Sequence, residues 1–281
     1  MPLSTGDYEK AASEALGVPV KVGSARLSVL TGVKVNLDNV SVSDAKIRLV
    51  RGFPEIGSLF GPKKAFDRVE LEGATLKQGQ AGAAIFGKAG GSNFSVGRIV
   101  IKQIKLDGPL TLPAFDVDAA VGSDGTVQTI NLSGPLTGKL TSSGNNVAFE
   151  IQAPSLSVPF VPALSLSDFG WKGTATPQGI GNSEWDGRVY DGVISGTARV
   201  RWGSNWSVEG DVRSRGVKVA VFAPALVSDG KVEARGNYSM SGPDPAKLGA
   251  SAGVEGSFKI EAGVIGNFDL GRALQTGGAQ V

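Results

Sequence analysis

Short alternating runs of apolar and polar residues extend from Val20 almost to the end of the chain. Glycine-containing turn sequences interrupt the runs at short intervals, for example at residues 123–125 (SDG), 142–146 (SSGNN) and 190–192 (YDG). A period of two residues with frequent turn residues is typical of half-buried antiparallel strands. The pattern therefore predicts a mainly β protein with on the order of 15 strands.

A single segment of helical period precedes these strands, in the sequence GDYEKAASEALG. Tyr8, Ala12 and Leu16 share one face of the predicted helix, which Asp7 can cap and Gly17 can end. We expect this apolar face to dock on the sheet that follows.

An eight-residue pattern recurs along the strands, with apolar residues at positions 1, 3, 6 and 8. It occurs as VNLDNVSV, VELEGATL, IVIKQIKL and, with aromatic residues, LSLSDFGW. Strict alternation would turn the second apolar pair to the opposite face of the sheet. A bulge or tight bend at residues 38–39, 72–73 and 102–103 would keep all four side chains on one face. Unless the pattern recurs by chance, the sheet should curve at these points.

A sheet of this size with few helices must close, fold into a sandwich or leave an apolar face open. We expect a long curved antiparallel sheet that forms an apolar groove, with a short N-terminal helix and a small C-terminal capping helix. A closed β-sandwich, which would bury the same residues internally, is the alternative. The candidate groove residues are Val35, Leu37, Val40, Val42, Leu71, Ile99, Ile101, Leu106, Leu164 and Leu166.

Length and charge narrow the function classes. A chain of 281 residues with 41% hydrophobic residues can bury a substantial core. A net charge of +2 is too small for non-specific electrostatic binding to a phosphate backbone, so no nucleic-acid partner is expected. The longest apolar run, at residues 219–227, is less than half of the roughly 20 residues that a membrane-spanning helix needs. No signal peptide is recognisable, so we expect any targeting segment to lie upstream or to have been cut away.

Candidate chemistry is sparse, because the chain has neither histidine nor cysteine. A Ser-His-Asp triad and a thiolate metal site are therefore impossible. Two carboxylate pairs, Asp116 with Asp118 and Glu184 with Asp186, fit a solvated outer sheet face, and the glycine-rich residues 87–93 fit a loop. We expect no metal, no cofactor and no enzymatic activity; a hydrolase of envelope lipids would need a nucleophile that the sequence does not offer.

Basic residues concentrate in the first half, where residues 44–110 carry 11 basic and 6 acidic side chains. Basic clusters attract anionic lipid headgroups, with about 1 kcal/mol per Lys or Arg near the surface. An ordinary solvated face is the alternative interpretation. The candidates for contact with a membrane surface are Lys46, Arg48, Lys63, Lys64 and Arg68.

Three stretches resemble AsmA-like proteins of Gram-negative bacteria. YEKAASEALGVPVKVGSARLSVLTGVKVNLDNVSV resembles the region that follows the family's membrane anchor, and RVYDGVISGTARVRWGSNWSVEGDV resembles its strand series. GSFKIEAGVIGNFDLGRAL is similar to its terminal signature of a strand, a hairpin and an aspartate-led helix. On this resemblance, residues 1–18 form the helix after a missing anchor, residues 19–255 an elongated sheet, and residues 256–281 a terminal hairpin with a capping helix.

The resemblance implies a periplasmic protein that is anchored in the inner membrane and related to proposed bridges for phospholipid. Its expected partners are phospholipid, the membrane surface and other envelope proteins. Asp269 would cap the terminal helix, and Leu270 and Leu274 would cover the open end of the sheet. Bound acyl chains would be buried against aliphatic side chains of the groove; a scaffolding module that supports outer-membrane assembly is the alternative.

Overall fold

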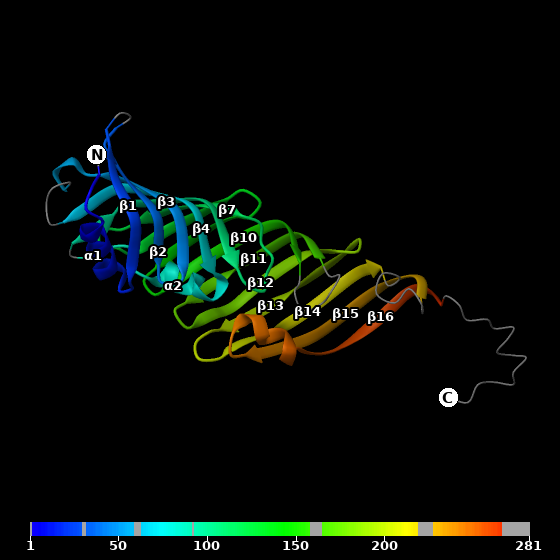
Figure 1. Ribbon diagram of the computed structural model, residues 1–281. Coiled ribbons are helices and arrows are strands. Elements are labelled where there is room, and N and C mark those ends of the chain that lie inside the picture. Colours follow the sequence, from blue (N-terminus) through cyan, green and yellow to red (C-terminus); the bar gives the residue numbers. More distant parts are fainter. Residues whose placement is uncertain are drawn as a thin grey trace, which may run out of the picture.

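A computed structural model shows one long twisted sheet with short helices at its margins (Figure 1). It describes residues 2–29, 32–58, 63–91, 93–157, 165–218 and 227–265. The sheet has 16 strands and is open, with β1 and β16 at its two ends. The prediction of a mainly β, largely antiparallel sheet is confirmed, and the closed-sandwich alternative is wrong, because a single sheet runs the length of the molecule.

The strands follow one another across the sheet almost in chain order. They are β1 (Val20–Ser28), β2 (Lys34–Val42), β3 (Ala45–Pro54), β4 (Lys64–Lys77), β5 (Phe94–Val96), β6 (Arg98–Asp107), β7 (Phe115–Val121), β8 (Val127–Ser133), β9 (Thr137–Ser143), β10 (Asn146–Ser157), β11 (Ser165–Thr176), β12 (Gly179–Val189), β13 (Gly192–Arg201), β14 (Trp206–Lys218), β15 (Val227–Gly242) and β16 (Gly253–Ile265).

One crossover interrupts the antiparallel order. Both β5 and β6 pair with β4 in parallel, β5 along its first residues and β6 along the rest. A parallel pair needs a crossover connection, and here it carries the 3₁₀ turn η2 (Gln78–Gln80) and the helix α2 (Ala81–Phe86). Two further 3₁₀ segments, η1 (Ile56–Ser58) and η4 (Pro245–Ser251), lie in other connections.

The predicted turns join consecutive strands. Tyr190 and Asp191, between β12 and β13, both adopt positive φ, 44° and 65°. That pair of angles defines the two-residue hairpin turn whose twist matches the strands. Gly125 and Gly144 take the positive φ of the β7–β8 and β9–β10 turns, at 81° and 60°. Glycine and aspartate tolerate this backbone region better than most residues do.

Left-handed residues occur at each predicted bend. Asn39, Gly73 and Gln103 have φ of 52°, 67° and 58°, and Asp168 repeats the feature at 51° in LSLSDFGW. The β6–β7 register also shifts between Ile101 and Ile104, which marks a bulge. The prediction of bends is therefore confirmed, and the apolar residues on both sides of each bend pack on the same face of the sheet.

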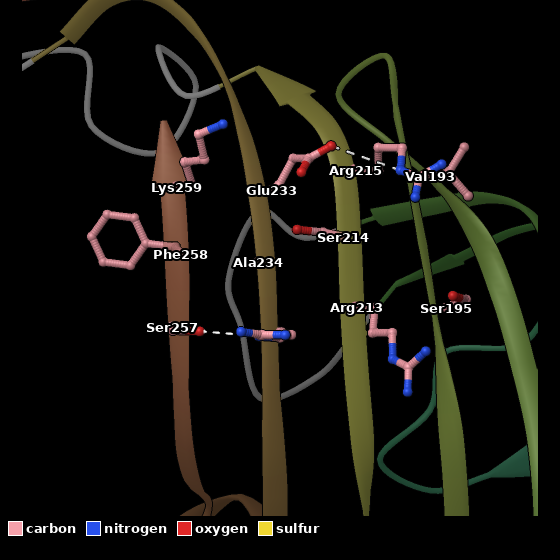
Figure 2. A pocket seen from close by; sticks show the side chains of 11 residues that line it. Val193, Ser195, Arg213, Ser214, Arg215, Glu233, Ala234, Ser257, Phe258 and Lys259 are labelled. Carbon is pink, nitrogen blue, oxygen red and sulfur yellow. Dashed lines mark hydrogen bonds and ion pairs between the residues drawn. The ribbon is translucent and has the colours of Figure 1, made fainter. Parts of the chain in front are cut away.

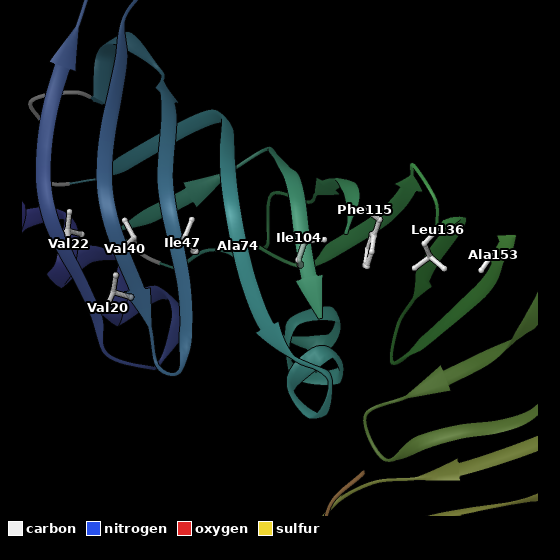
Figure 3. Close-up of a cluster of buried hydrophobic side chains, with 9 residues drawn as sticks. All are labelled: Val20, Val22, Val40, Ile47, Ala74, Ile104, Phe115, Leu136 and Ala153. Carbon is white, nitrogen blue, oxygen red and sulfur yellow. The ribbon is translucent and has the colours of Figure 1, made fainter. Parts of the chain in front are cut away.

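The core is a band of side chains along this one face (Figure 3). The largest cluster of buried residues crosses from β1 to β10, and partly buried aliphatic side chains pack against it. Its buried members are Val20, Val22, Val40, Ile47, Ala74, Ile104, Phe115, Leu136 and Ala153. The predicted curvature explains their burial, because a curved sheet brings the side chains of neighbouring strands together on its inner side.

The N-terminal helix α1 (Thr5–Leu16) covers the free edge of β1. It ends at Gly17 with φ 68°, as predicted, but Asp7 lies within the first turn and the N-cap position is Ser4. Ser13 Oγ accepts a hydrogen bond from the Val20 N–H at 2.9 Å, and Glu9 Oε1 accepts one from the Val22 N–H at 2.8 Å. The helix thus satisfies backbone donors that an edge strand would otherwise expose.

The C-terminal prediction needs a correction. Residues 256–265 are not a hairpin, because β16 continues without a turn to Ile265 and pairs with β15 throughout. Glu261 faces Lys231 and Val264 faces Asp229, so Ala262 and Gly263 oppose Gly230 alone and form a bulge. The sheet therefore extends beyond residue 255. The proposed capping residues Asp269, Leu270 and Leu274 lie outside the described residues.

Candidate functional site

A single row of apolar residues crosses the whole sheet, with one residue from every strand except β5. Each member lies directly opposite the next in the strand register, so all of them share one face. We call it the central row. Its members are Ala25, Leu37, Val50, Leu71, Ile101, Val117, Leu132, Gly138, Ile151, Trp171, Trp185, Gly196, Val212, Gly236 and Gly256.

The central row is only half-buried. Ala25 beneath the N-terminal segment is buried and Gly256 on the last strand is exposed, while every member between them is half-buried. With strands about 4.8 Å apart, the row is roughly 65 Å long. The apolar face therefore presents a continuous, partly accessible strip from one end of the sheet to the other.

The first half of the strip is lined by aliphatic side chains. Leu71 on β4 stands between Val50 and Ile101, and Ile101 is followed by Val117. The row beside it contains Val35 and Phe149, which are buried. Branched and aromatic side chains on neighbouring strands pack well on a pleated surface. The side chains of this half therefore pack as in a hydrophobic core, but one side of the layer stays partly accessible.

In the second half, aromatic rings lie over glycines. Trp185 faces Gly196 on β13, and a Cβ built on that glycine would come within 2.8 Å of the indole ring. Tyr238 faces Gly210 on β14 in the same way, with its hydroxyl 2.8 Å from the position of such a Cβ. The glycines thus leave room for flat rings, which fill the face where aliphatic side chains are missing.

Hydrogen bonds hold these two rings in place. The Tyr238 hydroxyl donates to the Thr197 carbonyl at 2.8 Å, and the Trp185 indole N–H lies 3.2 Å from the same carbonyl and 3.3 Å from the Tyr238 oxygen. Burial raises the pKa of Tyr238 above its ordinary value. The phenol is therefore neutral at physiological pH and serves as a hydrogen-bond donor on the apolar face of the sheet.

Part of the apolar face is covered by α2. Its residues Ile85 and Phe86 pack against the buried cluster of Leu140, Val147, Phe149 and Ala175 on β9–β11. Gly82 of the same helix approaches the Trp202 ring. The crossover from β4 thus reaches the second half of the sheet and narrows the accessible strip beside the central row.

The predicted groove residues lie on this face. Leu37, Leu71 and Ile101 belong to the central row. Of the others, Val35, Val40 and Leu166 are buried, and Val42, Ile99 and Leu106 are half-buried. Leu164 lies outside the described residues. The structure thus brings together nine of the ten predicted residues, three of them as buried core.

The opposite face is charged and carries ion pairs between neighbouring strands. Arg26 pairs with Asp38 at 2.6 Å, Lys102 with Asp116 at 2.8 Å, and Lys172 with Glu184 at 3.0 Å. Hydrogen bonds from Lys102 and from the Gln103 amide hold the pKa of Asp116 below its ordinary value, and Arg98 does the same for Asp118. As predicted, these carboxylates lie on a solvated outer face, and their ion pairs support the strand register.

The predicted basic residues do not form one patch. Lys46 is exposed near the β2–β3 turn, whereas Lys63 and Lys64 lie at the other end of β4, roughly 35 Å away along the strands. Arg48 pairs with Glu72, and Arg68 pairs with Glu70 at 3.2 Å and lies over the Phe53 ring. Their charge is thus divided between two ends of the strands and partly neutralised.

Within the described ranges, no three acidic side chains gather closely enough to hold a metal ion. In the same ranges, no helix combines the length and the apolar character that crossing a membrane would require.

Two parts of the apolar face could not be predicted from the sequence. One is α2, whose six residues AGAAIF are too short and too small to give a helical signal. The other is the second half of the central row, where glycines replace aliphatic side chains. Only the register reveals that Gly196 of the row lies under Trp185, and that Gly210, in the row beside it, lies under Tyr238.

Comparison with known proteins leaves this surface as the main guide to function. No protein-family model, no curated protein and no solved structure matches the chain.

Proposed function

We propose that the protein binds the acyl chains of phospholipids along the central row. It would act without enzymatic chemistry, as a lipid-binding or lipid-conducting protein of the bacterial envelope. The observation that carries the proposal is the unbroken, half-buried apolar row across the sheet. Each methylene group that leaves water for this surface gains about 0.8 kcal/mol, while headgroups would stay in solvent beside the row.

The envelope location comes from the sequence resemblance. The stretches that resemble AsmA-like proteins imply a periplasmic position, an N-terminal anchor in the inner membrane and a role between the two membranes. A sheet about 65 Å long could guide lipid over part of that distance. Membrane surfaces and other envelope proteins are the proposed partners at its ends.

The experiment is mass spectrometry of organic extracts from the purified protein. We expect phospholipid to copurify with the wild-type chain, and Ile101→Arg to reduce its amount severalfold. The matched control is Val100→Arg, because Val100 is the neighbouring apolar residue of β6 on the charged face, opposite Asp118. A long arginine stem can keep its charge in water, and thermal melts would verify that both variants fold.

Absence of phospholipid from the folded wild-type protein would contradict lipid binding. It would then favour the alternative of a scaffolding module that supports outer-membrane assembly. Equal loss of lipid in both variants would also contradict the proposal, because the assignment requires the apolar face alone.

A further inference from the structure

The outer edge of β16 is long and apolar on one face. The strand has 13 residues and pairs with β15, and among the described residues no other strand lies beside it. Val254 and Phe258 are 71% and 73% exposed, and Ile260 is 38% exposed. The Phe258 ring projects past the outer side of β16, away from β15 (Figure 2). A long edge with these features is a template for another strand.

The sheet itself shows what such a strand would supply. Trp185 and Tyr238 each lie over a glycine that is directly opposite on the adjacent strand. Phe258, in contrast, faces Ala234 on β15, and its own neighbour Gly256 faces Gly236. The edge strand therefore carries both a ring that has no glycine opposite it and a glycine that has no ring over it.

We propose that β16 pairs with β16 of a second copy of this chain, antiparallel about a twofold axis at Ser257. In this register Phe258 of each copy lies opposite Gly256 of the other, and Val254 lies opposite Ile260. The pairing repeats the ring-over-glycine contact twice by symmetry. A twofold interface uses the same patch on both subunits, and a single strand here carries both halves of the contact.

Charge selects the same register. Residues 255, 257, 259 and 261 share the charged face, and the twofold axis at Ser257 places Glu255 of each copy opposite Lys259 of the other. A shift of the axis by one residue in either direction would place Glu255 opposite Ser257 or opposite Glu261. Opposite charges across strands stabilise a pair and like charges destabilise it. Within the described residues Glu255 has no ion pair, whereas Lys259 bonds Glu261 of its own strand at 2.8 Å.

The consequence is a longer sheet with one continuous apolar face. An axis perpendicular to the sheet keeps the apolar faces of the two copies on the same side. The two α1-covered edges would then stand at the far ends of the dimer. The inference does not depend on lipid binding, because it rests on the edge alone.

A cysteine on the axis tests the pairing directly, since the chain has no cysteine of its own. Directly opposite residues in antiparallel strands have Cα atoms about 4.5–5.5 Å apart, within the range that a disulfide spans. We expect full-length Ser257→Cys to form a disulfide-linked dimer under mild oxidation. Ser195→Cys, on the interior strand β13, is the matched control and should give little disulfide-linked dimer under the same oxidation, although its non-covalent pairing through β16 is unchanged.

Charge reversal tests the register by sedimentation. Glu255→Lys and Lys259→Glu should each weaken dimerisation about tenfold, because both symmetric pairs become repulsive. Each variant alone would then be mainly monomeric. An equimolar mixture of the two should form heterodimers, since both cross-strand pairs are attractive again.

Two outcomes would overturn the proposal. One is a wild-type chain that sediments as a monomer at micromolar concentration together with a Ser257→Cys variant that forms no disulfide-linked dimer; occupation of the edge by residues 266–281 or by a different protein would give this result. The other is a dimer whose strength neither charge reversal changes, because it would have to use another surface.

Discussion

The two end strands of the sheet differ in how far other residues of the chain cover their outer edges. At β1, residues 2–16 cover the edge: Ser13 and Glu9 accept hydrogen bonds from β1 amides, and the Leu3 N–H donates to the Ala25 carbonyl at 2.9 Å. At β16, the apolar side chains Val254 and Phe258 remain exposed. Val22 on β1, by contrast, is 8% exposed.

Among the described residues, cover over an end strand of this sheet is therefore found at β1 and not at β16. Exposed edges invite pairing, and proteins commonly cover or charge them. The N-terminal edge uses a helix for that purpose, whereas the described part of the C-terminal edge keeps a surface that can continue the sheet. The central row thus begins at β1, whose edge residues 2–16 cover, and ends at β16, to which a partner strand can be added.

Matched valine substitutions on the two end strands should have the largest contrast in stability. Val22→Asp places a carboxylate in the buried cluster with Val20 and Val40, against which Ala12 of α1 packs, and an unpaired buried charge costs about 3–5 kcal/mol. Val254→Asp stays in water and should change stability by no more than about 0.5 kcal/mol. Urea unfolding of both variants, at a concentration where the wild type is monomeric, measures the difference.

Similar losses in both variants would contradict the comparison. They would mean that the Val254 side chain is covered as well as that of Val22. A stable Val22→Asp variant would show instead that the Val22 side chain is not buried at this end of the sheet.

Removal of the side-chain acceptors from α1 should have an intermediate effect. Glu9→Ala with Ser13→Ala leaves the Val20 and Val22 amides without their partners, which should cost about 1–3 kcal/mol. Faster hydrogen exchange of these two amides and increased self-association through β1 are expected. Glu14→Ala is the control, because Glu14 contacts the Asn93 side chain at 3.4 Å and not β1. Unchanged exchange in the double variant would show that the helix side chains do not protect the edge.

Acid should loosen the first strand slightly more than the last. Hydrogen bonds from Arg26 and Ser24 hold the pKa of Asp38 below its ordinary value. A lowered folded pKa gives stability that is present above the unfolded pKa and is lost as pH falls through the folded pKa. Since Arg26 and Ser24 lie on β1 and Asp38 on β2, this loss should weaken their pairing.

The last strand differs because its ion pair joins two residues of the same strand. Lys259 holds the pKa of Glu261 below its ordinary value, and both residues lie on β16. Protonation of Glu261 therefore breaks no link between β15 and β16. Hydrogen exchange of β1 and β16 amides on either side of pH 4 should show a small acceleration in β1 alone, and Asp38→Asn should abolish that pH dependence. An equal response in both strands would contradict this assignment.

The sequence predicted the bends well because each leaves a local mark. The apolar period shifts parity at VNLDNVSV, and Asn39 tolerates the left-handed backbone that the shift needs. Gln103 is a less usual residue for that conformation. Its amide donates to Asp116 Oδ1 at 2.9 Å, a contact that only the neighbouring strand can supply.

Features that depend on strand register could not be predicted in the same way. EAG at residues 261–263 has the composition of a turn, yet it forms a bulge because β15 continues opposite it. The rings of Trp185 and Tyr238 fill the face above glycines of other strands, and no local period records which glycine lies opposite. The continuity of the central row is likewise a property of 14 strand pairings together.

The most direct measurement of the central claim is site-specific photo-crosslinking to lipid in the bacterial envelope. A photoreactive phenylalanine analogue would replace Leu71, Ile101 or Val212 in the central row. On the same strands, Glu70, Lys102 or Arg213 on the charged face would serve as controls. The account predicts phospholipid adducts at the three row positions and background levels at the three controls. Folded protein without adducts along the row, or with equal adducts on both faces, would contradict it.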